Sequence, residues 1–501
     1  MQSSQELFKK IIETDKNRRV LSSVQNLLSW DQETYLPEAA TEFRAEQVEL
    51  LASMAHEKLT SKTFEHALGH LIDIKTGSIQ KEDLTDEQKA ALREWRRDFL
   101  RASTLPNSFV KEHASLTSKA FTAWVSAKKE NDFSIFAPFL QSIVDASKKR
   151  AEYYGYKNHP YDALVDEYEP GMTTEKLKKV FSELKPFLID LVKKCGSAEN
   201  EFPFLHKTFP KDGQMDICAT LMERMGIDPR RSRLDHAHHP FCMPVHPNDL
   251  RLTTHSDLSN FFNNIGATLH EGGHGLYELG LPVEKFGTPL CEAVSLGVHE
   301  SQSRFWECFI GLSRPFITYL HSLLSTPFKE QLEGVTVDEM YSGLTQVTPS
   351  FIRIKSDEVT YCLHVILRFE LEVALVEGTI NVDDVPDAWN EKMQEYLGIY
   401  PSNFSEGCLQ DVHWSHGIFG YFPTYALGNI YAGALFESFA QAHPDWKLKV
   451  EKGEMQFIRD YLTEKVHKFG RQYLPEELLK QATGQGLSLK PYKKYLQKKF
   501  S

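Results

Sequence analysis

ATLHEGGHGLYE, at residues 267–278, is the stretch that decides how the rest of the chain is interpreted, because it contains the pattern His-Glu-x-x-His. Residues four apart on a helix project from the same face, so His270 and His274 can direct both imidazoles at one ion. Glu271 lies about 100° further round the helix, within reach of a water bound to that ion. The stretch predicts a metal-dependent hydrolase in which a zinc-type ion acidifies water and the carboxylate takes the proton.

The alternative is a helix that carries two histidines and a glutamate by chance. Three glycines inside the stretch argue against it, because each costs a helix about 1 kcal/mol relative to alanine. These glycines are Gly272, Gly273 and Gly275. We expect them to leave room for a substrate backbone beside Glu271.

The segment before this helix has a different texture. Residues 236–247, HAHHPFCMPVHP, contain three prolines and cannot form a helix, whereas residues 249–254 alternate as an edge strand does. Ser256 or Asp257 is the expected N-cap of the metal-binding helix. We expect the histidines of residues 236–247 to be structural rather than a second metal site.

Most of the remaining chain has apolar side chains at helical spacing, which predicts a mainly α fold. The clearest patterns occupy residues 5–30, 44–57, 87–102, 107–130, 132–154 and 173–225. Residues 161–172 are dense in carboxylates, which could form an acid/base couple as in glycosidases. The preferred interpretation of that stretch is a helix end closed by Pro170 and Gly171.

Composition excludes several classes of function. The 501 residues carry a net charge of −12, which argues against nucleic acid as a partner. The chain has no apolar run of about 18 residues and no signal segment at its start, so neither a membrane span nor export is expected. Seven cysteines are scattered without metal-binding spacing, which is typical of reduced thiols in a cytoplasmic protein.

A catalytic metal site needs at least a third protein ligand. Glu284, Glu292, Glu300 and Glu307 follow the metal-binding helix and all qualify by distance along the chain. Their spacing alone does not choose between them. Further on, the Gly- and aromatic-rich residues 401–428 have the character of loops that line pockets.

Several ordered motifs accompany His-Glu-x-x-His. They are WDQET at 30–34, YDAL at 161–164, HPF at 239–241, D-x-R-x-T at 249–253, HESQ at 299–302, IRIKSD at 352–357 and G-x-x-Q-D-x-H-W at 407–414. With these motifs the chain resembles the carboxypeptidase Taq family of metallocarboxypeptidases over nearly its full length. One position departs from the family pattern, since Ser356 stands where alanine is usual, and we expect little consequence.

The resemblance implies what spacing leaves open. It makes Glu300 the third ligand of one divalent metal ion, which we expect to be Zn²⁺, with Co²⁺ as the alternative. It implies a large helical metallopeptidase with a deep central groove and a small β-element beside the metal-binding helix. We expect a single domain over residues 1–501, with an N-terminal helical half to about residue 230 and the metal and substrate site in residues 231–501.

The implied activity is the release of single residues from free peptide C-termini with broad specificity, by a homodimer. In this mechanism Glu271 is the general base, and His413 and Tyr425 are candidates to stabilise the oxyanion. Arg353 and Arg251 are candidates to bind the terminal carboxylate, because the guanidinium fork suits it. The alternative for each arginine is an internal ion pair, with Asp357 or Asp249 respectively.

Two further residues are expected to contact the peptide. Gln410 is a candidate for its backbone, and His239 belongs to the motif set and is assigned to substrate binding as well. The strand that carries Arg251 could pair with an extended peptide. The rival functions are an oligopeptidase that cuts internally and, from another class, a non-catalytic helical peptide-binding protein, which the intact Glu271 argues against.

Overall fold

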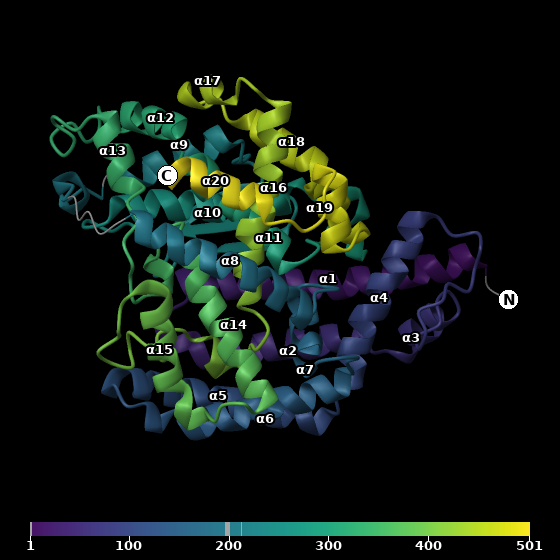
Figure 1. Cartoon of the computed structure of the whole chain (residues 1–501). Coiled ribbons are helices and arrows are strands. Elements are labelled where there is room, and N and C mark those ends of the chain that lie inside the picture. Colours follow the sequence, from purple (N-terminus) through teal and green to yellow (C-terminus); the bar gives the residue numbers. More distant parts are fainter. Residues whose placement is uncertain (1–2, 196–200, 212, 501) are drawn as a thin grey trace.

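The structure is a computed structural model that describes residues 3–195, 201–211 and 213–500, and it is mainly helical, as predicted (Figure 1). The helices before the sheet are α1 (Ser4–Thr34), α2 (Thr41–Leu59), α3 (Lys62–Gly69), α4 (Asp86–Thr104), α5 (Asn107–Glu130), α6 (Ala137–Tyr154), α7 (Pro160–Tyr168), α8 (Thr174–Cys195) and α9 (Gln214–Met225). Those after it are α10 (Phe261–Gly280), α11 (Leu296–Arg304), α12 (Arg314–Leu324), α13 (Val337–Leu344), α14 (Tyr361–Glu377), α15 (Val385–Leu397), α16 (Pro423–Ala442), α17 (Trp446–Glu451), α18 (Gln456–Lys465), α19 (Pro475–Thr483) and α20 (Lys490–Phe500).

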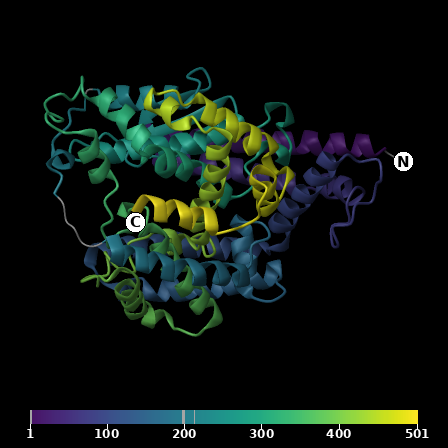
Figure 2. The same cartoon turned by 45° about the horizontal axis from the view of Figure 1, so that its top comes forward.

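The helices surround α10 and α11, which lie in the interior of the molecule. In the turned view, α5 and α6 (blue) run along the lower side and the teal segments that include α10 lie above them (Figure 2). The N-terminal part of α1 extends away from this body together with α3 and α4 (Figure 1). Among the described residues, no helix has both the length and the apolar character that crossing a bilayer requires.

A three-stranded sheet packs against α10. Its strands are β1 (Ser232–His236), β2 (Cys242–His246) and β3 (Asp249–Thr254), in the order β1-β3-β2, with β1 parallel and β2 antiparallel to β3. The prediction of an edge strand at 249–254 is therefore wrong, because β3 is the central strand. Both of its edges already carry a partner, so β3 cannot pair with a substrate peptide.

The metal-binding helix α10 begins at Phe261 with Asn260 at the N-cap, so the expectation of Ser256 or Asp257 as the cap is wrong. Both residues are used otherwise. The Ser256 N–H donates to Nε2 of His236 at 3.2 Å, and the Asp257 carboxylate accepts from the Ser259 N–H at 2.8 Å in a local turn. These contacts hold the backbone out of helical geometry until residue 260.

Helix α11 follows after two short 3₁₀ turns. It starts at Leu296, where the Ser295 hydroxyl accepts from the Val298 N–H, and Cys291 lies in the preceding turn. Residues Phe305–Gly311 continue it as a π-helix.

Two hydrophobic clusters form the interior. The larger one runs from Ala120 to Leu496 and so includes helices from both sides of residue 230. A smaller cluster joins α1, α3 and α4 and includes Leu290 from the segment ahead of α11. Residues of the N-terminal half predicted from the sequence therefore contribute to both clusters. The single domain over residues 1–501 stays a prediction.

Candidate metal centre and active site

His270, His274 and Glu300 converge at one point between α10 and α11. The Glu300 Oε2 lies 3.7 Å from Nε2 of His270 and 3.5 Å from Nε2 of His274. Their donor atoms all lie within 4.8 Å of one another. Ligands at about 2.0–2.2 Å from a tetrahedral ion stand roughly 3.3–3.5 Å apart, so the three side chains fit a zinc-type ion.

The other three glutamates considered from the sequence lie elsewhere. Glu307 contacts the cluster only through His270, since its Oε2 accepts from Nδ1 of that ring at 2.8 Å. Glu292 pairs with Arg471 at 2.9 Å, and Glu284 is exposed. Of the four, only Glu300 faces both histidines.

Each histidine is oriented by a partner on its other ring nitrogen. For His270 the partner is Glu307, which also accepts from Nη1 of Arg304 at 2.8 Å. For His274 it is His299, whose Nδ1 lies 2.6 Å from Nδ1 of His274. These contacts at Nδ1 leave both Nε2 atoms directed at Glu300, as a metal-binding imidazole requires.

Sequence reasoning missed the partner of His299. The Nε2 of His299 lies 2.8 Å from Oε1 of Glu278, which makes a chain from His274 through His299 to Glu278. Glu278 stands four residues after His274, on the same face of α10. Helical spacing was a signal for it, but the intervening histidine comes from α11 and is invisible in the spacing.

Glu271 is the one carboxylate beside the cluster that has no partner within the described ranges. It makes no hydrogen bond or ion pair there, in contrast to Glu278 and Glu307. Burial raises its pKa, and the charges of Glu300 and Glu307 add to the shift. A half-buried, unengaged carboxylate with a raised pKa is suited to take up and release a proton.

The glycines of α10 do not make room for substrate, so that expectation is wrong. A Cβ on Gly273 would stand 2.5 Å from the carbonyl oxygen of Gln302 on α11. A Cβ on Gly272 would meet Met225 on α9, and one on Gly275 would meet Leu250 on β3. All three glycines allow close packing of α10 against its neighbours.

Arg353 is held in a buried network centred on Asp411. Its Nη2 donates to Asp411 Oδ1 at 2.9 Å, and its Nη1 donates to the Tyr361 hydroxyl at 3.1 Å. Arg368 pairs with the other carboxylate oxygen of Asp411 at 2.5 Å. Burial would raise the pKa of Asp411, but the two arginines hold it well below its usual range.

The ion pair of Arg353 is thus internal, but with Asp411 and not with Asp357. Asp357 instead accepts from the Val359 and Thr360 N–H groups at 2.9 and 3.0 Å. Sequence reasoning assigned no role to Asp411 or Arg368. The position of Asp411 between Gln410 and His413 in one motif was the available signal.

Gln410 has no free group for a peptide. Its Oε1 accepts from the backbone N–H of Arg353 at 2.9 Å and from Nη2 of Arg368 at 2.7 Å. Its Nε2 donates to the carbonyls of Phe351 at 2.9 Å and Glu406 at 2.8 Å. Both arginines of the network are therefore held by this amide as well as by Asp411.

His413 and Tyr425 lie together, with the ring Nε2 3.1 Å from the phenol oxygen. Burial lowers the pKa of His413 to about 3, so its ring is neutral at neutral pH. Burial also raises the pKa of Tyr425, and Glu300 contributes to the shift, which puts the phenol within electrostatic reach of the metal cluster. Both groups can donate a hydrogen bond.

Arg251 is not brought to this cluster. Leu250 and Leu252 of β3 are buried, and Leu250 faces α10, so Arg251 points to the opposite face of the sheet. There it pairs with Asp249 at 2.6 Å and lies 4.9 Å from the Trp30 ring of α1, which is the internal ion pair considered as its alternative. His239 is exposed.

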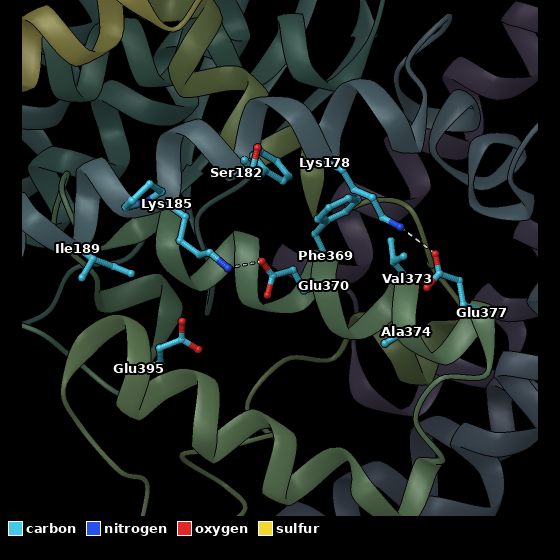
Figure 3. Close-up of a pocket in the computed structure, with 12 residues that line it drawn as sticks. Lys178, Ser182, Lys185, Ile189, Phe369, Glu370, Val373, Ala374, Glu377 and Glu395 are labelled. Atoms are coloured by element: carbon cyan, nitrogen blue, oxygen red, sulfur yellow. Dashed lines mark hydrogen bonds and ion pairs between the residues drawn. The ribbon is translucent and has the colours of Figure 1, made fainter.

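A cavity of about 570 Å³ lies between α8, α14 and α15, away from the metal cluster. Figure 3 shows that Lys185 pairs with Glu370 and Lys178 with Glu377 across it. Phe181 also lines it. The cationic groups on its wall are thus neutralised by partners from α14, and it contains none of the residues of the metal cluster.

Comparison with known proteins identifies relatives over nearly the whole chain. The model of the carboxypeptidase Taq (M32) metallopeptidase family matches residues 10–500. Carboxypeptidase 1 of Bacillus subtilis is 38% identical over 95% of this chain and 94% of its own, and thermostable carboxypeptidase 1 of Thermus thermophilus is 36% identical over 99% and 98%. The crystal structure of the M32 carboxypeptidase from Deinococcus radiodurans superposes with a TM-score of 0.94 at 35% identity, with 99% of each chain covered.

Proposed function

The chain belongs to the carboxypeptidase Taq (M32) family of metallopeptidases and is a metal-dependent carboxypeptidase, and from this premise we propose which residues carry out the reaction. The observation that carries the proposal is the convergence of His270, His274 and Glu300 beside the unengaged carboxylate of Glu271. We assign the three converging side chains as metal ligands and Glu271 as the general base.

A divalent metal ion held by the three ligands supplies Lewis acidity toward water and toward the scissile carbonyl. Two imidazoles and one carboxylate favour Zn²⁺, and Co²⁺ would be held similarly. Glu271 takes the proton of the attacking water and returns it to the leaving amine. Elemental analysis of the purified protein would identify the native ion.

His413 and Tyr425 are proposed to donate hydrogen bonds to the oxyanion that forms at the scissile carbonyl.

The Nη1 of Arg353 bonds the Tyr361 hydroxyl, and the Tyr361 ring lies 4.8 Å from the guanidinium of Arg304, which binds Glu307. This chain of contacts connects Arg353 to the ligand His270. We therefore propose that Arg353, and not Arg251, binds the terminal carboxylate.

This assignment gives a reason for broad specificity, which is part of the proposal. Recognition through the terminal carboxylate depends on a group that every C-terminal residue carries, whatever its side chain. Asp411 and Gln410 then serve to position Arg353, since all of the hydrogen-bonding groups of the Gln410 amide are already engaged with protein.

The decisive experiment compares a peptide with its C-terminally amidated copy. Because Arg353 is proposed to bind the free carboxylate, the amidated copy loses one charge-assisted contact. It should therefore be cleaved at least about tenfold more slowly. Equal cleavage of both peptides would favour the oligopeptidase alternative.

Glu271→Gln tests the chemistry separately. The variant should keep its metal content and lose turnover by about 10²-fold or more, because general-base catalysis contributes on that order. Metal content of the variant is the control, and turnover close to that of the wild-type enzyme would overturn the assignment of Glu271.

We further propose a homodimer and a cytoplasmic location. Phe43, Leu50 and Met54 of α2 are exposed and lie on one face, since their spacing of 7 and 4 residues returns to the same side of a helix. An exposed apolar stripe of this kind is a candidate subunit contact, which light scattering would test. The location is supported by seven cysteines that form no disulfide.

A further inference from the structure

The carboxylate-rich stretch at residues 161–172 contains one side chain unlike its neighbours. Asp162 bonds the hydroxyl and N–H of Thr174 at 2.6 Å, and Asp166 pairs with Arg101 at 2.6 Å, so these groups hold local structure. Glu169, at the end of α7, is fully buried and turns inward. An ionisable group is rarely buried unless its partners compensate for lost hydration.

The partners of Glu169 come from two helices of the metal centre. Its Oε2 accepts from the Gly297 N–H of α11 at 3.0 Å, and its Oε1 accepts from the Tyr431 hydroxyl of α16 at 2.9 Å. Gly297 lies in the first turn of α11, where N–H groups have no partner within the helix. The carboxylate thus joins the beginning of α11 to the middle of α16.

The same pair of helices meets again one turn further along, at the proposed metal ligand. Glu300 stands three residues after Gly297, and Gly428 stands three residues before Tyr431, so each pair shares a helix face. A Cβ on Gly428 would stand 2.7 Å from Cβ of Glu300. A Cβ on Gly297 would stand 2.5 Å from Oε2 of Glu169.

We infer that Glu169 is a positioning residue for the metal site, because its bridge between α11 and α16 fixes the register in which Glu300 reaches His270 and His274. Because Gly297 and Gly428 already lie so close to the opposite side chains, α11 and α16 cannot move closer together at either position. If the bridge is lost, α11 can shift against α16. One helical turn is about 5.4 Å long, and a much smaller shift is enough to misplace a ligand atom. This inference rests on the proposed ligand set.

The test measures metal binding, not only turnover. Glu169→Gln keeps the size of the side chain but removes its charge and one acceptor oxygen, so the contact with Tyr431 can persist only with donor and acceptor reversed. We expect Zn²⁺ affinity, measured by competition with a chelator, to fall about 10- to 100-fold, the usual effect of losing a residue that orients a ligand. The visible spectrum of the Co²⁺-loaded protein should change, because it reports ligand geometry.

Glu167→Gln is the matched control, because Glu167 lies two residues away and its carboxylate has, among the residues that the structure describes, only long contacts of 3.9 Å to Arg101 and Arg150. It should bind Zn²⁺ as the wild-type protein does, within about twofold. Tyr431→Phe removes one donor and leaves the carboxylate, so it should show a smaller loss of affinity. It serves as the test if Glu169→Gln does not fold.

Glu300→Gln separates this inference from the proposed function. If Glu300→Gln loses Zn²⁺ and a folded Glu169→Gln, or Tyr431→Phe in its place, retains the affinity and spectrum of the wild-type protein, the positioning role is overturned and the ligand set stands. If Glu300→Gln binds Zn²⁺ as tightly as the wild-type protein, both are overturned.

Discussion

At the scale of the residue, the two motif arginines differ in where their remaining N–H donors lie. A guanidinium carries five N–H groups. Those of Arg353 make bonds at Nε and Nη2 to Asp411 and at Nη1 to Tyr361, which leaves one N–H on each terminal nitrogen. A carboxylate needs two such donors for a bidentate contact. Arg251 donates through Nε and Nη2 to Asp249, which leaves three N–H groups, but they lie on the face of the sheet turned from α10.

We expect Arg353→Lys to lose preference for a free C-terminus. An ammonium keeps the charge but cannot form the bidentate contact, so kcat/KM for a free-acid peptide should fall about 10- to 100-fold, with less change for the amidated copy. The ratio of the two kcat/KM values is the measurement. Arg251→Lys is the control and should leave that ratio unchanged. An unchanged ratio in Arg353→Lys would show that another group binds the carboxylate.

At the scale of the element, the contact between α10 and α11 depends on Gly273. The backbone of Gln302 and Ser303 lies 2.5 and 2.7 Å from the place where its Cβ would be. A backbone contact cannot give way as a flexible side chain can. The cost of this glycine in helix propensity is therefore offset by an approach that brings the ligands of the two helices together.

Gly273→Ala should accordingly destabilise the protein by about 1–3 kcal/mol and weaken Zn²⁺ binding, because overpacking must push α10 and α11 apart. Urea unfolding and chelator competition measure the two effects. Gly266→Ala, on the same helix, is the matched control. Its Cβ would meet nothing within 4 Å, so it should be neutral or stabilise by up to about 1 kcal/mol. Equal stability of the two variants would contradict this account.

The elements also show where sequence reasoning succeeds and where it stops. The spacing of His270 and His274 is local, so helix geometry alone predicted that they share a face. The choice of Glu300 among four glutamates depends on how α11 packs, and only the family resemblance supplied it. The prediction of an edge strand is wrong because the alternation of apolar and polar side chains in 249–254 shows only that the two faces of the strand differ. It does not indicate how many neighbouring strands pair with it.

The same limit applies to the glycines and to Asp411. Helix propensity identifies Gly273 as costly, but it does not tell whether a substrate or another helix occupies the space. The sequence shows Asp411 beside Gln410, but pairing with Arg353 and Arg368 depends on contacts across 58 and 43 residues of chain. Long-range packing is the information that local patterns lack.

At the scale of the whole molecule, a buried ionic network attaches the N-terminal helices to the metal half. Arg471 pairs with Glu94 of α4 at 2.6 Å, with Asp98 at 2.8 Å and with Glu292 at 2.9 Å. Glu292 also binds Arg19 of α1 and lies only a few residues ahead of α11. One guanidinium therefore joins three parts of the chain that belong to two hydrophobic clusters.

Arg471→Met should lower the free energy of unfolding by about 3–5 kcal/mol, because it removes the guanidinium that bonds the carboxylates of both Glu94 and Asp98 and leaves Arg93 as the remaining cation beside Glu94. Burial would raise the pKa of Asp98, but Arg471 holds it below its usual value. The loss should therefore be largest near neutral pH and shrink in acid, as Asp98 becomes protonated. Urea unfolding at several pH values measures both effects. Lys194→Met is the control: its pair with Asp190 is exposed on both sides, and its loss should change stability by less than about 1 kcal/mol. If the two variants lose the same stability, the network does not hold the N-terminal helices to the rest of the molecule.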